Sequence, residues 1–233
     1  KEHLLAAVAE DSTAASALGW LAAVSFRLND GEATVWTQRE QRHAGSAPAG
    51  VALAMAIVAR AVGDGLPSHW PPPGASPELL QARAVLEQAL VVEPRQPDLL
   101  EAYTTTFLTD AHADPAALGA LLVAEEIRPR RSVLMGMEAV LAAHEHRLGA
   151  ALHHTARIPN VPDNEWWKRA ATNVTLGLAS DSLHSLVRAA RWGAADSLVA
   201  LVERGMPRGD HGWAKQTRAR LKELKPVATP KQR

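Results

Sequence analysis

The chain has 233 residues, of which 47% are hydrophobic and 21% are charged, a composition that argues against extended disorder. Lys and Arg together number 25, as do Asp and Glu, so the chain as a whole has no net charge to attract polyanions. It contains no cysteine, which excludes disulfides, zinc–thiolate sites and cysteine nucleophiles.

Apolar residues recur at helical spacing along most of the chain, and no segment alternates apolar and polar residues as a half-buried strand does. We therefore expect an all-α protein. The predicted helices span residues 2–10, 13–28, 32–43, 49–62, 76–93, 97–110, 114–127, 132–147, 149–158, 164–178, 182–191, 194–203 and 210–225. Most connections are short, so consecutive helices should lie antiparallel. The most apolar stretch, residues 47–59, is too short to cross a bilayer, so no membrane span is expected.

Residues 63–77 form the one long segment without helical periodicity. Its three consecutive prolines, Pro71 to Pro73, favour an extended conformation. Trp70 lies inside this segment. It either holds the loop against the helices or is presented to a partner, since long loops in compact domains often carry function.

An internal repeat marks the middle of the chain. A set of two alanines, a leucine and a proline recurs at the same intervals 35 residues later, which predicts stacked helix hairpins. The two sets are Ala82, Leu86, Ala89 and Pro94, and Ala117, Leu121, Ala124 and Pro129.

These residues resemble the tetratricopeptide repeat family, whose helix pairs carry small residues where the two helices touch and a proline at the turn to the next unit. Leu100, Tyr103 and Phe107 match the large residues of the family's first helix, and Leu18-Gly19 resembles its Leu–Gly pair. The resemblance implies an α–α superhelix, a solenoid of antiparallel hairpins.

The predicted organisation has three parts. Residues 1–160 form the repeat array with the Pro-rich insertion at 63–77. Residues 161–225 form further hairpins and a capping helix, and the stretch from Leu183-His184 to Gly205 resembles an ankyrin helix pair. Residues 226–233 form a flexible tail.

In tetratricopeptide arrays the first helix of each pair lines the concave surface. Here those helices would offer Glu101, Thr105, Thr109 and Val140, with no cation to hold a partner's terminal carboxylate. The resemblance therefore implies a neutral-to-apolar groove for a helix or an extended peptide.

Two adjacent tryptophans, Trp166 and Trp167, are further candidates for partner binding. Neighbouring side chains on a helix point about 100° apart, so one can be buried while the other is exposed as an interface anchor. The alternative is that both pack in the core or at its end.

Four histidines flank the turn at residues 148–149: His144, His146, His153 and His154. If the flanking helices are antiparallel, these imidazoles and Glu145 could bind zinc or a similar metal. The alternative is a set of polar residues near a hairpin turn. We expect no cofactor.

The C-terminal residues are basic. From Trp213 to Arg233 there are seven basic residues and one acidic residue, a net charge of +6, so the remainder carries −6. We interpret this stretch as a solvated terminal helix with a frayed end. The alternative is an anion-binding tail.

The leading hypothesis is a protein-interaction scaffold that binds another protein or a peptide and is not an enzyme. A second hypothesis is an accessory helical domain of a larger enzyme, and a third is a helical metalloenzyme using the histidines. No nucleic-acid partner is expected. High Ala and Arg usage suggests a soluble bacterial protein of the cytoplasm or periplasm, and the missing initial Met suggests a processed form or a piece of a longer protein.

Overall fold

The computed structural model describes residues 1–45, 48–64, 70–110, 114–129, 132–160, 165–206 and 211–225. Over these ranges the chain forms twelve helices and no strand, which confirms the predicted all-α class. The helices are α1 (Glu2–Glu10), α2 (Ala15–Leu28), α3 (Ala33–His43), α4 (Val51–Gly63), α5 (Pro77–Val92), α6 (Pro97–Thr105), α7 (Pro115–Ile127), α8 (Ser132–His144), α9 (Leu148–Arg157), α10 (Glu165–Arg188), α11 (Trp192–Gly205) and α12 (Gly212–Leu224). The predicted tail at 226–233 and residues 65–69 of the predicted insertion lie outside the described residues.

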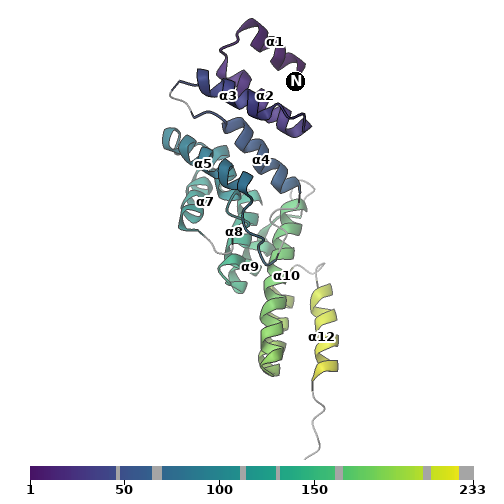
Figure 1. The fold of residues 1–233 in the computed structure, drawn as a ribbon. Coiled ribbons are helices and arrows are strands. Elements are labelled where there is room, and N and C mark those ends of the chain that lie inside the picture. Colours follow the sequence, from purple (N-terminus) through teal and green to yellow (C-terminus); the bar gives the residue numbers. More distant parts are fainter. Residues whose placement is uncertain are drawn as a thin grey trace, which may run out of the picture.

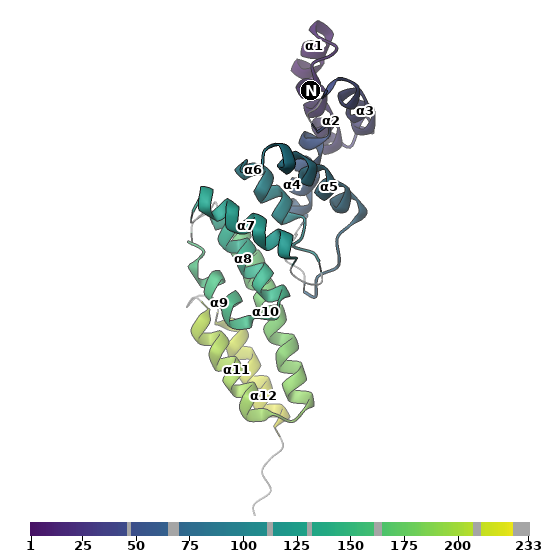
Figure 2. The same cartoon turned by 90° about the vertical axis from the view of Figure 1, so that its left-hand side faces the viewer.

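The helices form an elongated molecule, with α1 at one end and α12 at the other (Figures 1 and 2). Helices α2, α4, α6, α8 and α10 contact one another in that order. Each of them also packs against the helix that follows it, giving the pairs α2–α3, α4–α5, α6–α7, α8–α9 and α10–α11. The even-numbered helices from α2 to α10 therefore form an inner row, the odd-numbered helices from α3 to α11 lie outside it, and α12 packs against α11. Within the described ranges, no helix combines the length and apolarity needed to cross a membrane.

The 35-residue repeat corresponds to matching faces of α5 and α7. All six of its helical positions are buried: Ala82, Leu86, Ala89, Ala117, Leu121 and Ala124. The two helices also end alike, since Glu93 and Arg128 adopt nearly the same backbone angles (φ −126°, ψ 71° and φ −131°, ψ 73°). A proline follows each of these residues and disfavours further helix, which explains the shared ending.

A second repeat lies at the turns of the hairpins α8–α9 and α10–α11. Residues 147–151 read Arg-Leu-Gly-Ala-Ala and residues 191–195 read Arg-Trp-Gly-Ala-Ala. His146 and Ala190 precede these segments with φ of 58° and 53°, and the backbone bonds around both form a Schellman ending. The shared cap gives both hairpins the same sharp reversal.

Two predicted helix boundaries are wrong. Helix α6 ends at Thr105 rather than Asp110. From Thr106 onward the backbone N–H groups bond to carbonyls three residues earlier, which makes tighter turns than an α-helix. The Thr106 hydroxyl also donates to the Tyr103 carbonyl at 2.7 Å. Helix α10 runs unbroken through residues 178–182, where two helices were predicted. Its Ser180 hydroxyl bonds back to the Leu176 carbonyl at 2.8 Å, so the polar residues there do not interrupt the helix.

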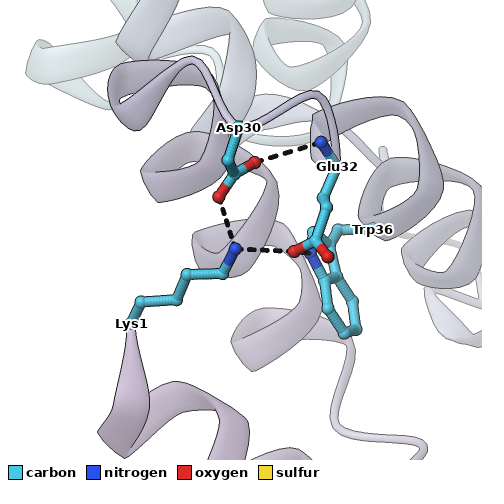
Figure 3. Close-up of polar contacts among 4 residues, drawn as sticks. All are labelled: Lys1, Asp30, Glu32 and Trp36. Atoms are coloured by element: carbon cyan, nitrogen blue, oxygen red, sulfur yellow. Dashed lines mark hydrogen bonds and ion pairs between the residues drawn. The ribbon is translucent and has the colours of Figure 1, made fainter.

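Polar contacts join α1 to the α2–α3 turn (Figure 3). The Lys1 ammonium contacts the Asp30 carboxylate and lies 2.6 Å from Glu32 Oε2, and the Trp36 indole N–H donates to that same oxygen at 3.3 Å. These groups are at the surface, so each contact contributes little to stability. The apolar anchor of α1 is Val8, which packs with Leu18 and other residues of α2.

A buried carboxylate lies between α2 and α3. Glu40 Oε2 accepts the Gly50 N–H at 2.9 Å, and a Cβ added to Gly19 would lie 2.6 Å from Glu40 Oε1. Only glycine at position 19 leaves room for this carboxylate. Burial raises the pKa of Glu40, and the hydrogen bond from Gly50 partly offsets that rise.

We expect Glu40→Gln to stabilise the protein at pH 7, because glutamine keeps an acceptor for Gly50 and removes a buried charge. The raised pKa means that the folded state holds the Glu40 proton more tightly than the unfolded state does. Wild-type stability therefore falls as pH rises from the ordinary carboxyl pKa of 4.5 through the folded value. Urea unfolding of both proteins at pH 4 and pH 7 checks this. A variant no more stable than wild type at pH 7 would contradict it.

An arginine joins α5 to the end of α6. The Arg83 guanidinium lies 3.7 Å from the centre of the Phe107 ring, and its Nη2 donates to the Thr106 carbonyl at 2.6 Å and to Asp110 at 3.1 Å. It is largely buried. Arg83 therefore connects α5 to the tighter turns that follow α6.

Candidate functional site

The segment of residues 70–76, here called the strap, lies against the inner row of helices. Its Trp70 ring packs near two histidines at the end of α8, with ring centroids 6.2 Å from His144 and 5.9 Å from His146. The indole N–H donates to Asp181 Oδ2 of α10 at 2.6 Å. A Cβ added to Gly177 would lie 2.6 Å from the Trp70 Cγ, so the indole rests directly on the α10 backbone. Of the two roles predicted for Trp70, the structure shows the one that holds the loop against the helices.

His144 lies beneath this tryptophan and is only 1% exposed. Neither of its ring nitrogens forms a hydrogen bond with any described residue. Burial, and to a lesser degree the nearby His146, lowers the pKa of His144 from 6.5 to about 4. The imidazole is therefore neutral at pH 7.

The other end of the strap meets the turn after α6. The Gly74 N–H donates to the Thr109 carbonyl at 2.9 Å, and Gly74 has a φ of 88° that favours glycine. A hollow of about 470 Å³ between the strap, α4 and the start of α5 includes Thr109 in its lining. The buried Thr109 hydroxyl has no hydrogen-bond partner in the described part of the chain. Two unsatisfied polar groups, on His144 and Thr109, thus lie under the two ends of the strap.

The predicted concave groove is not open. Thr105, Thr109 and Val140 are buried, and of these three only Thr109 lines a hollow, the one beside the strap. The physical reason is that α6 and α8 are covered by α4, α5, α7, α9 and α10, and that the strap lies against the same core. Glu101 is partly exposed, and its Oε1 lies 3.9 Å from the Arg128 guanidinium.

An open groove is found instead on the outer side, between α3 and α5. This outer groove has a volume of about 560 Å³ and a lining without any charged residue: Gln41, Ala44, Gly45, Pro48, Ala49, Val85, Gln88 and Val92. Its two glutamine amides are exposed and make no hydrogen bond to another described residue. Val91 and Val92, at the end of α5, are 80% and 59% exposed. The groove combines exposed amides, which can pair with a peptide backbone, and apolar side chains.

The histidines fall into two pairs. His144 and His146 both face Trp70, whereas the rings of His153 and His154 contact each other at 5.5 Å between centroids. Among the residues the structure describes, no three His, Asp or Glu side chains are grouped so as to hold a metal ion. The arrangement does not bring the four imidazoles into one site.

A carboxyl pair joins α7 to α8 beside His154. Burial, followed by the charge of the nearby Glu138, raises the pKa of Glu125. His154 Nδ1 lies 2.9 Å from Glu138 Oε2, within ion-pair range although not in hydrogen-bonding geometry. These contacts tie together three consecutive helices.

Of the tryptophan pair, Trp167 packs within the array. A Cβ added to Gly136 of α8 would lie 2.6 Å from the Trp167 ring, so the indole lies on the α8 backbone as Trp70 lies on that of α10. Trp167 is partly buried in the main core. The side chain of Trp166 lies outside the described residues.

Helix α12 buries Ala214 and Leu221, and the Trp213 indole N–H donates to Ser180 at 3.0 Å. Arg218 of α12 and Lys225, directly after it, form ion pairs: Arg218 Nη1 donates to Glu203 at 2.8 Å and Lys225 lies 2.6 Å from Asp196. The basic excess of this helix is therefore partly neutralised by α11.

Neither the outer groove nor the surface on which Trp70 rests was predicted. That surface, here called the seat of Trp70, is formed by Gly177, Asp181 and His144. Gln41 and Gln88 carry no signal in the sequence, whereas Gly136 and Gly177 lie inside helices, where glycine has a cost in helix propensity. A glycine inside a predicted helix is the one signal that could have pointed to a side chain resting on that backbone.

Comparisons with protein-family models, with curated proteins and with solved structures found no match to this chain.

Proposed function

We propose that this protein is an interaction scaffold that binds a neutral-to-apolar peptide or helix of another protein, and that its role is binding rather than catalysis. The observation that carries the proposal is the outer groove, whose described lining is uncharged and includes two exposed glutamine amides and the exposed Val92. Exposed apolar side chains next to unpaired hydrogen-bonding groups are typical of peptide-binding surfaces.

We further propose that the helix array is a solenoid of the tetratricopeptide type. The 35-residue repeat supports this, because its buried positions and the ends of its helices match between α5 and α7. The contacts along the inner row support it as well, since each hairpin buries one face against the next. A chain built in this way presents a long surface to partners.

The proposal is tested by selecting peptides from a random displayed library against the immobilised protein. We expect the selected peptides to be neutral and apolar. Val92→Glu should weaken their binding by about tenfold or more, because it places an unpaired charge beside the bound peptide.

Leu201→Glu is the matched control, since it makes the same kind of change at an exposed leucine of α11. It should leave peptide binding unchanged. Selection of no peptide, or of peptides that bind Val92→Glu and wild type equally, would reject the outer groove as the binding site.

A further inference from the structure

The strap occupies the inner side of the helix array as a bound peptide would. It is extended by three prolines, it inserts one large aromatic side chain, and it makes a main-chain hydrogen bond from Gly74 to Thr109. An aromatic anchor followed by a stiff proline segment is a common form of peptide ligand, because little conformational entropy is lost on binding. The seat of Trp70 is therefore a recognition site already filled by the chain itself.

The strap is an incomplete occupant of this site. It leaves both ring nitrogens of His144 and the hydroxyl of Thr109 buried without hydrogen bonds among the described residues. Buried polar groups without partners are uncommon in folded proteins and are costly. A different segment that placed a polar group near either residue would gain hydrogen bonds that the strap does not make.

We infer that the inner side of the array, from Gly177 and Asp181 to Thr109, is a second binding site for a partner segment that carries an aromatic residue followed by prolines. In the isolated protein the strap holds this site closed. The partner segment displaces the strap, places its aromatic ring on Gly177 and takes over the hydrogen bond to Asp181. This inference does not depend on the outer groove.

The test supplies the strap sequence in trans. The probe is a fluorescently labelled peptide with the sequence of residues 70–76, WPPPGAS, and the proteins are wild type, Trp70→Ala and Trp70→Ala/Gly177→Val. We expect Trp70→Ala, whose seat is empty, to bind the peptide at least about tenfold more tightly than wild type, in which the tethered strap competes. The double variant fills the seat with the valine side chain and should lose this binding.

A peptide with alanine in place of tryptophan is the matched ligand control and should bind neither protein. The inference is overturned if Trp70→Ala retains its helical circular dichroism but does not bind the tryptophan peptide. It is equally overturned if Trp70→Ala binds the alanine peptide as tightly as the tryptophan peptide. The same holds if the double variant binds the tryptophan peptide as tightly as Trp70→Ala does.

A measurement on the unaltered protein covers the case in which Trp70→Ala does not fold. Displacement requires the strap to open without global unfolding, so the Gly74 amide should exchange its hydrogen faster than the amide of Leu141 in the buried helix α8, by about a hundredfold or more. Equal protection of the two amides would show that the strap opens only when the protein unfolds, which would overturn the inference.

Discussion

Replacing Gly177 by valine is expected to destabilise the protein by about 3 kcal/mol, because it removes Trp70 from its seat. A side chain at position 177 cannot coexist with the indole, whose Cγ would lie 2.6 Å from the new Cβ. Moving the ring loses its contacts with His144 and its hydrogen bond to Asp181. Valine itself is tolerated in a helix, so the loss comes from the strap and not from α10.

A double-mutant cycle isolates this mechanism. Trp70→Ala should cost a similar amount, and the double variant Trp70→Ala/Gly177→Val should be little less stable than either single variant. Urea unfolding of the four proteins gives the coupling energy directly. If the two losses add, Gly177→Val acts through something other than Trp70, and the seat described here is wrong.

Acidification from pH 7 to pH 4.5 is expected to remove stability through His144. Its folded pKa of about 4 lies below the ordinary value of 6.5, so the unfolded state binds the proton more readily than the folded state. The stabilisation is complete above pH 6.5 and is lost as pH falls toward 4. Once the pH lies below both pKa values, the difference between them removes about 3 kcal/mol from the free energy of unfolding.

His144→Leu tests the assignment, because it removes the titrating group and no hydrogen bond to a described residue. The variant should match or exceed wild-type stability at pH 7 and should lose less stability between pH 7 and pH 4.5. His184→Gln, at an exposed position of α10, is the control and should keep the wild-type pH dependence. A His144→Leu protein with the full wild-type loss on acidification would show that His144 does not cause it.

The sequence predicted the helices and the buried faces of the central repeat because both depend on local spacing. Alanines and leucines at helical intervals predict which side of α5 and α7 is covered, whatever covers it. The boundaries failed where side chains bond to their own backbone, as Thr106 does at the end of α6. Propensity alone does not weigh such a bond against another turn of helix.

The candidate sites could not be predicted in the same way. Thr105 and Val140 would line an open surface only if no other segment covered the inner row. Helices far away in the chain cover it, and local spacing carries no information about them. Trp70 and Asp181 are 111 residues apart, and no local pattern connects them. The outer groove likewise arises where α3 and α5 leave a space, which depends on tertiary packing and not on the residues that line it.

Small-angle X-ray scattering tests the central claim most directly, namely that the helices form an elongated row of hairpins and not one compact globule. A compact globule of 233 residues has a radius of gyration of about 18 Å. The row of hairpins predicts a clearly larger radius and a distance distribution with a long tail, as the elongated outline in Figures 1 and 2 requires. A radius near the compact value with a symmetrical distribution would contradict the account.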